Sequence, residues 1–140
     1  MNEQENIQIA QEGYLLFTQG DIDNLLDLYT DDITFVFHGS SDLTPFTDTF
    51  RGKDQMRQFF AKVADILVFD SYETREFIGK GNKVIVLGHD KCTDKTTGIS
   101  METDWAHVLT MRDGKTARLE SYGDVRKMMT GFALSKHQEV

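Results

Sequence analysis

The stretch from residue 100 to residue 124, SMETDWAHVLTMRDGKTARLESYGD, constrains the fold more than any other part of the chain. Its first half alternates, because one parity holds Trp105, His107 and Leu109 while the other holds smaller or polar residues. Alternation with period two is typical of a β-strand whose two faces meet different surroundings. Residues 112–114, Arg-Asp-Gly, interrupt the pattern and predict a three-residue hairpin connection with a bulge, in which the glycine takes a positive φ. The stretch therefore predicts a β-hairpin.

The register of this hairpin places a titratable side chain on a face that otherwise looks buried. If Met111 pairs with Lys115, antiparallel pairing sets His107 opposite Leu119. The same pairing sets Trp105 opposite Ser121, on the same face as His107. A histidine beside an indole on an apolar face is a candidate functional group.

The remaining elements follow from periodicity and from turn residues. Helical spacing of apolar residues and strand-like alternation divide the rest of the chain, with a turn expected at Thr30–Asp32. Residues 1–140 form a single domain in this interpretation, with residues 125–140 as a weakly helical, frayed tail. The expected helices are 4–19, 21–29 and 53–67, and the expected strands are 33–38, 68–78, 82–93 and the two arms of the hairpin. This order predicts an α+β fold with the helices on one face of an antiparallel sheet.

Composition excludes several classes of function. The formal charge of −8 and the pI near 4.9 disfavour binding to nucleic acid, because phosphate backbones repel an acidic surface. No run approaches the roughly 20 apolar residues of a membrane span, and the first residues lack the features of a signal peptide. We therefore expect a cytoplasmic protein. Cys92 is the single cysteine, and the four histidines lie far apart without metal-ligand spacing, so we expect no metal.

The order of elements, together with three motifs, resembles a known superfamily. The motifs are GDIDNLLDLYTDDITF, FRGKDQMRQFF and VLTMRDGK. They resemble the SnoaL-like branch of the NTF2-like, ketosteroid-isomerase-like superfamily, over the range from about Ile7 to Asp124. The resemblance implies a cone of curved antiparallel sheet, wrapped by three helices from the N-terminal half, around an apolar pocket. Family members include isomerases, cyclases, dehydratases, epoxide hydrolases and noncatalytic binders, so the fold does not fix the function.

The catalytic residues of the family carry over only in part. Steroid isomerases of this fold use a tyrosine and an aspartate base at positions that fall on Gly13 and Phe37 here. Their second acid falls on His107. Polyketide cyclases of the SnoaL type also have a histidine there, but their catalytic aspartate position is occupied by Ser121. Tyr14 is one residue out of register with the family tyrosine, and neighbouring positions on a helix point in different directions.

The candidate site therefore centres on His107, with two interpretations left open. It is either a pocket acid, base or donor, or a core histidine satisfied by a neighbour such as Ser121. Asp124 is a second catalytic candidate if it curls toward the pocket. Ligand contacts are expected from seven further residues, Tyr14, Phe35, Phe37, Phe59, Trp105, Leu119 and Ser121.

Two functions of different class remain open. One is a cofactor-independent isomerase, cyclase or lyase that acts on an apolar carbonyl compound by proton transfer at His107. The other is a noncatalytic module that binds a small apolar or aromatic ligand, or serves dimerisation, and has lost the family acids. Ala106, Val108 and Tyr122 make the outer sheet face partly apolar, and the resemblance predicts a homodimer through that face. Because no acid is expected on the inner face, burial should lower the pKa of His107 and keep it neutral at pH 7.

Overall fold

The structure is a computed structural model that describes residues 2–38 and 49–123. In these ranges three helices and six strands follow one another, with the helices in the first half of the chain. The elements are α1 (Glu3–Thr18), α2 (Ile22–Asp27), β1 (Tyr29–Phe37), β2 (Thr49–Arg51), α3 (Gly52–Ile66), β3 (Leu67–Lys80), β4 (Lys83–Asp94), β5 (Ser100–Arg112) and β6 (Lys115–Gly123). Asp124 and the expected helical tail 125–140 lie outside the described residues.

Local signals explain where the helices begin and end. The side-chain oxygen of Asn2 accepts a hydrogen bond from the Glu5 backbone N–H at 2.8 Å, which caps the start of α1. Gly20, with φ 74°, follows the end of α1 in a conformation that other residues rarely adopt. On α3, Met56 and Phe59 are buried at helical spacing and face the sheet.

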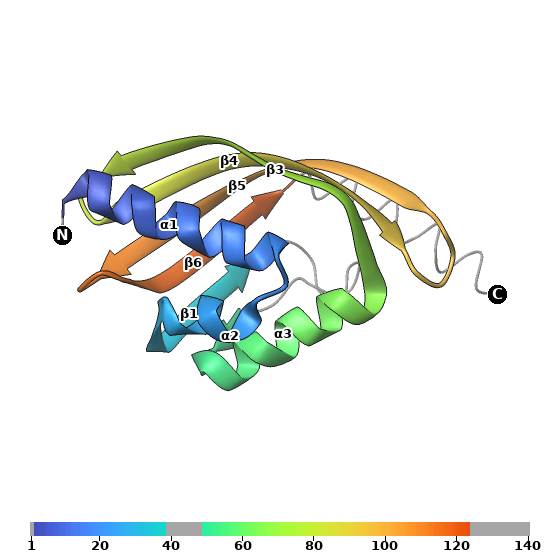
Figure 1. Cartoon of the computed structure of the whole chain (residues 1–140), viewed down its shortest axis with the longest axis horizontal. Coiled ribbons are helices and arrows are strands. Elements are labelled where there is room, and N and C mark those ends of the chain that lie inside the picture. Colours follow the sequence, from blue (N-terminus) through green and yellow to red (C-terminus); the bar gives the residue numbers. More distant parts are fainter. Residues whose placement is uncertain (1, 39–48, 124–140) are drawn as a thin grey trace.

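The six strands form one open sheet in the order β2-β1-β6-β5-β4-β3. Figure 1 shows the long strands arching over one side of the molecule with the helices gathered beneath them. Helix α1 packs against β3 and β4, and α3 packs against β1. The family fold is therefore confirmed in outline, but β1 runs parallel to β6, so the sheet is mixed rather than wholly antiparallel.

The first strand begins earlier than its sequence predicts. We expected a turn at Thr30–Asp32 and a strand over 33–38, whereas β1 already starts at Tyr29. A register shift between Tyr29 and Thr34 absorbs these polar residues while β1 follows β6. The prediction of a turn was wrong because long-range pairing overrides local turn propensity. Strand β2, at the edge, is too short to give an alternation signal.

The central hairpin is present, but its connection and register differ from expectation. Asp113 and Gly114, with φ 52° and 79°, form a two-residue loop, and Arg112 pairs with Lys115. The ladder then shifts between Thr110 and Met111, which leaves Ala117 as an extra residue on β6.

The shorter loop and the ladder shift together move the pairing by two residues in the part of the hairpin between Trp105 and Thr110. His107 pairs with Ser121 rather than Leu119, and Trp105 pairs with Gly123 rather than Ser121. The predicted pairs were wrong, but the offset is an even number of residues, so the four side chains keep a common face.

None of the helices in the described ranges is long and apolar enough to cross a membrane.

Candidate functional site

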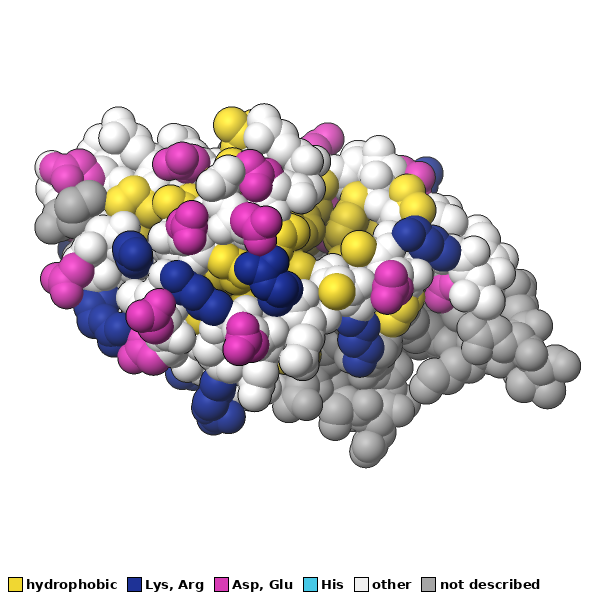
Figure 2. Space-filling model, turned by 60° about the horizontal axis from the view of Figure 1, so that its bottom comes forward, with side chains coloured by type: hydrophobic (Ala, Val, Ile, Leu, Met, Phe, Trp, Pro, Cys, Tyr) yellow, Lys and Arg dark blue, Asp and Glu magenta, His cyan; other side chains and the backbone are white. Residues whose placement is uncertain are grey.

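A cavity of about 160 Å³ lies between the concave face of the sheet and the helices. Its wall is almost entirely apolar, with aromatic rings from α1, α3, β1, β3 and β5. An apolar space of at least this volume has room for an aromatic ring. On the face drawn in Figure 2, hydrophobic side chains gather in the middle, among charged ones. The cavity is the candidate site in the described part of the chain.

The residues expected to contact a ligand all line this cavity. The helices supply Tyr14 and Phe59, β1 supplies Phe35 and Phe37, and the hairpin supplies Trp105, His107, Leu119 and Ser121. Asp124 lies outside the described residues, so its proposed role is not placed.

Trp105 lies flat against the sheet because the residue beside it is a glycine. Gly88 pairs with Trp105, and a Cβ atom built on Gly88 would lie 2.2 Å from Cζ2 of the indole. The indole is 7% exposed and stacks on the His107 ring with centroids 4.1 Å apart. Its face thus forms part of the cavity wall rather than filling the cavity.

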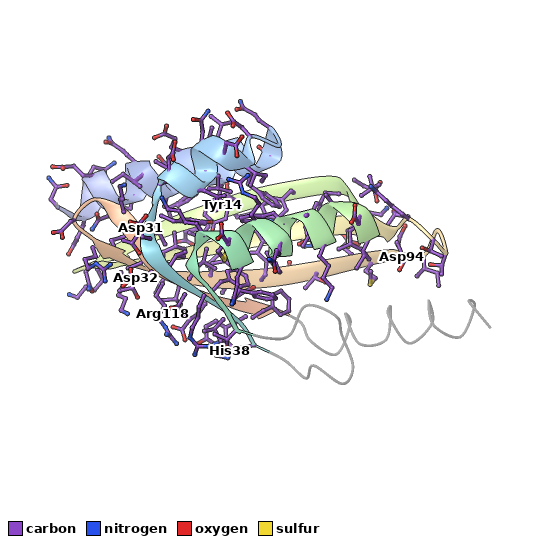
Figure 3. All side chains as sticks on the ribbon, turned by 90° about the horizontal axis from the view of Figure 1, so that it is seen from below. Tyr14, Asp31, Asp32, His38, Asp94 and Arg118 are labelled. Atoms are coloured by element: carbon purple, nitrogen blue, oxygen red, sulfur yellow. The ribbon has the colours of Figure 1, made fainter. Side chains whose placement is uncertain are left out.

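Tyr14 and His107 form a hydrogen-bonded pair inside the cavity. The Tyr14 hydroxyl oxygen lies 2.6 Å from Nδ1 of His107, and Figure 3 shows Tyr14 in the interior between α1 and α3. Sequence register indicated that Tyr14 and Gly13 would point in different directions, yet both line the cavity, because α1 crosses the sheet with that side facing inward. The sequence carries no signal for this contact between residues 93 positions apart.

Burial fixes the charge state of this pair. Desolvation lowers the pKa of His107 to about 3, although the residue is only partly buried and lines the cavity. Burial also raises the pKa of Tyr14 well above its ordinary value. Both groups are therefore neutral at pH 7, in line with the neutral His107 expected from the sequence.

Asp90 is a charged site residue that the sequence interpretation missed. It lies on β4, lines the cavity, and is only partly buried. Burial is the largest effect on this carboxyl and raises its pKa to about 6, while the neighbouring His89 and the Trp105 N–H lower it. A signal was present, since Asp90 shares the inward parity of Val84 and Val86 in the expected strand.

His38 and Asp32 lie away from the cavity. His38 stacks on Tyr122 with centroids 4.2 Å apart and faces Glu120, away from the cavity (Figure 3). Asp32 is exposed and pairs with Arg112 at 2.5 Å. Cys92 is buried in the cavity wall, and burial raises its pKa to about 12. Among the residues that the structure describes, no cluster of His, Cys, Asp and Glu could hold a metal ion.

Comparison with solved structures shows the same architecture in several proteins. An NTF2-like protein from Burkholderia xenovorans LB400 is 28% identical, with a TM-score of 0.85, 94% of this chain covered and 98% of that one. TerC, crystallised with polyporic acid, is 26% identical with a TM-score of 0.80, 92% of this chain and 98% of that one being covered. An LEH-like epoxide hydrolase from M. tuberculosis shares the fold at 16% identity, with a TM-score of 0.74 and 94% and 91% covered.

The sequence itself matches one family model over most of its length. No curated protein matches the chain significantly. The model of the SnoaL-like domain, however, matches residues 10–119, which include α2, α3 and nearly all the strands around the cavity. The chain therefore belongs to the SnoaL-like domain family.

Proposed function

We propose that the cavity binds a small, largely apolar carbonyl compound and promotes proton transfer on it, as a cofactor-independent isomerase, cyclase or lyase. The observation that carries this proposal is the neutral Tyr14–His107 pair in an otherwise apolar cavity. That TerC was crystallised with polyporic acid supports a small-molecule ligand for a cavity of this kind.

The pair offers one hydrogen-bond donor to a ligand whichever way its own hydrogen bond runs. If the Tyr14 hydroxyl donates to Nδ1, neutral His107 carries its proton on Nε2. If Nδ1–H donates instead, the Tyr14 hydroxyl proton is free. A donor in an apolar site that meets a carbonyl oxygen stabilises the enolate formed when a solvent water takes a proton from the adjacent carbon, and the enolate is later reprotonated by solvent.

His107 acts in this proposal as a donor and not as the base that we first considered. With a pKa of about 3 it accepts a proton poorly at neutral pH. This observation, with Phe37 and Ser121 at the family's acid positions, also favours the alternative function, a noncatalytic module that only binds the ligand.

Hydrogen exchange on a model ketone separates the two functions. 2-Tetralone, an apolar bicyclic ketone, would be mixed with the protein in D₂O and the loss of its α-proton signal followed by NMR. The proposal predicts faster exchange with the protein, slowed about tenfold to a hundredfold by Tyr14→Phe or His107→Gln. Asp65→Asn, an exposed change on α3, is the control and should exchange like the parent protein. Binding without accelerated exchange would favour the noncatalytic module. A protein that neither binds 2-tetralone nor accelerates its exchange would contradict both functions.

We also propose that the outer sheet face forms a homodimer. Apolar cross-strand pairs lie side by side there, Ile85 with Val108 and Leu87 with Ala106, next to Tyr122, which is 42% exposed. Light scattering at micromolar concentration should give twice the chain mass. A Tyr122→Glu variant should shift the mass to the monomer, and a monomeric parent protein would contradict this proposal.

A further inference from the structure

The indole N–H of Trp105 is buried without a hydrogen-bond partner. The residue is 7% exposed, and Nε1 has no partner within hydrogen-bond geometry. A buried N–H left unpaired costs free energy, so native structures rarely keep one without a reason. The Asp90 carboxyl lies close enough for this N–H to lower its pKa, although the two do not make a hydrogen bond of ordinary geometry.

Asp90 and His107 are too far apart to act on the same bond. Asp90 pairs with Thr103 on β5, and a strand advances roughly 13 Å from Thr103 to His107 at about 3.3 Å per residue. The Trp105 side chain lies between them on the same strand face. The Asp90 end is therefore a separate polar site in the cavity, distinct from the Tyr14–His107 pair.

The groups around Asp90 define what this site can bind. Tyr72 pairs directly with Asp90 and presents its ring to the cavity, with its centroid 5.2 Å from that of Trp105. Cys92 lies two residues on along the same face, and burial keeps both Tyr72 and Cys92 protonated at neutral pH. His89 is adjacent in sequence but points to the outer face, where it contacts Glu102 and Asp104.

An acceptor beside a donor selects one kind of ligand group. A hydroxyl can donate its proton to the Asp90 carboxylate and accept the Trp105 N–H at the same oxygen. A ketone would leave the carboxylate unpaired, and an ammonium group could not accept the indole proton. The Tyr72 and Trp105 rings favour an aromatic group that packs against them.

We propose that Asp90 and the Nε1–H of Trp105 form a subsite that binds the hydroxyl of a hydroxyaryl ligand. This inference deepens the proposed function, since it rests on the proposal that the cavity takes a small ligand and names the chemical class of that ligand. The subsite explains why the cavity keeps a carboxylate and an unpaired N–H in an apolar wall.

Three probes of similar shape and size test the inference, namely p-cresol, p-xylene and p-toluidine. The chain has one tryptophan, so its indole N–H gives a single NMR resonance that reports on Nε1 directly. At pH 7.5 we expect p-cresol to move this resonance downfield and to bind at least about tenfold more tightly than p-xylene. We expect p-toluidine to bind more weakly than p-cresol.

Variants at Asp90 and Trp105 test where in the cavity the preference for p-cresol over p-xylene arises. Asp90→Leu should reverse the order so that p-xylene binds better than p-cresol, and Trp105→Phe, followed through the Gly88 amide, should reduce the preference. Asp65→Asn should keep it. Equal binding of p-cresol and p-xylene, no p-cresol binding up to its solubility, an unmoved indole resonance, or a preference that survives Asp90→Leu would each overturn the inference.

The outcome is separable from that of the ketone experiment. Tyr14→Phe and His107→Gln should keep the p-cresol preference, because they change the other end of the cavity. A protein that prefers p-cresol but leaves 2-tetralone unexchanged would refute the proton transfer and retain the subsite. Loss of the p-cresol preference in Tyr14→Phe would place the p-cresol hydroxyl at the His107 end and overturn the subsite.

Discussion

The His107 end and the Asp90 end of the cavity lie on the same sheet face, yet burial acts on their charges in opposite ways. Desolvation lowers the pKa of His107 to about 3 and raises that of Asp90 to about 6. At pH 7 the imidazole is neutral and paired with Tyr14, whereas the carboxyl is mostly ionised and lies near an indole N–H that has no hydrogen-bond partner. The protein itself supplies the hydrogen-bond partner at the His107 end, whereas the polar groups at the Asp90 end are left for a ligand to bind.

The largest expected effect comes from removing the titration of His107. Its folded pKa lies below the unfolded value, so the stability present above about pH 6.5 declines as pH falls and levels off below about 3. Between pH 7.5 and pH 4, the free energy of unfolding of the parent protein should fall by about 3 kcal/mol more than that of His107→Gln. Urea unfolding at intermediate pH values measures this difference, since other groups contribute alike in both proteins. Parallel pH profiles would contradict the neutral histidine.

Substitution of Gly88 should disturb the indole that separates the two ends. In Gly88→Ala the new Cβ would lie 2.2 Å from Trp105 Cζ2 and 2.6 Å from the Glu73 carbonyl oxygen. We expect a loss of about 3 kcal/mol in the free energy of unfolding and a shifted indole resonance. The matched control is Gly13→Ala, where the nearest atom is an ordinary 3.5 Å away and the helix should gain about 0.5 to 1 kcal/mol. Equal melting temperatures for the two variants would show that the indole does not depend on Gly88.

Neutralising Asp90 should stabilise the protein, with a pH dependence opposite in sign to that of His107. Because the folded pKa of about 6 lies above the ordinary 3.8, ionisation of Asp90 lowers the free energy of unfolding of the parent protein progressively as pH rises through this range. Asp90→Asn should therefore be more stable by about 2 kcal/mol at pH 8 and nearly equal at pH 4. Thermal unfolding at both pH values tests the sign, and a destabilised variant at pH 8 would mean that the carboxylate has a partner.

The smallest expected effect is the loss of the Tyr14 hydroxyl. Tyr14→Phe removes one partly buried hydrogen bond to His107 and should cost about 1 kcal/mol. It should leave the Trp105 indole resonance in place, because the change is confined to the His107 end. A resonance that moves as far as it does in Gly88→Ala would show that the two ends are coupled.

How much of the site could be predicted depends on which interactions are local. Alternation placed four residues on one face, namely Trp105, His107, Leu119 and Ser121. This placement is correct because the predicted register was off by an even number of residues. The error itself was two residues, one from the two-residue loop at Asp113 and Gly114 and one from the bulge at Ala117, which no residue type in that segment indicates.

Two further site features show the opposite limits of sequence reasoning. Asp90 could have been found, since the alternation of its strand already pointed it inward. The Tyr14–His107 contact could not, because it depends on the angle at which α1 crosses the sheet, and that angle is a product of packing across the whole domain.

The parallel pairing of β1 with β6 has a consequence for how the domain folds. The ladders from β3 to β6 join consecutive segments, whereas Phe35 and Phe37 reach their partners on β6 only by closing most of the chain into a loop. Distant contacts of this kind form late, so we expect β1 to dock last and to bring these two rings into the cavity wall at the end. A ligand would then find no complete cavity in the transition state for folding. A bound ligand should therefore slow unfolding while leaving the folding rate unchanged.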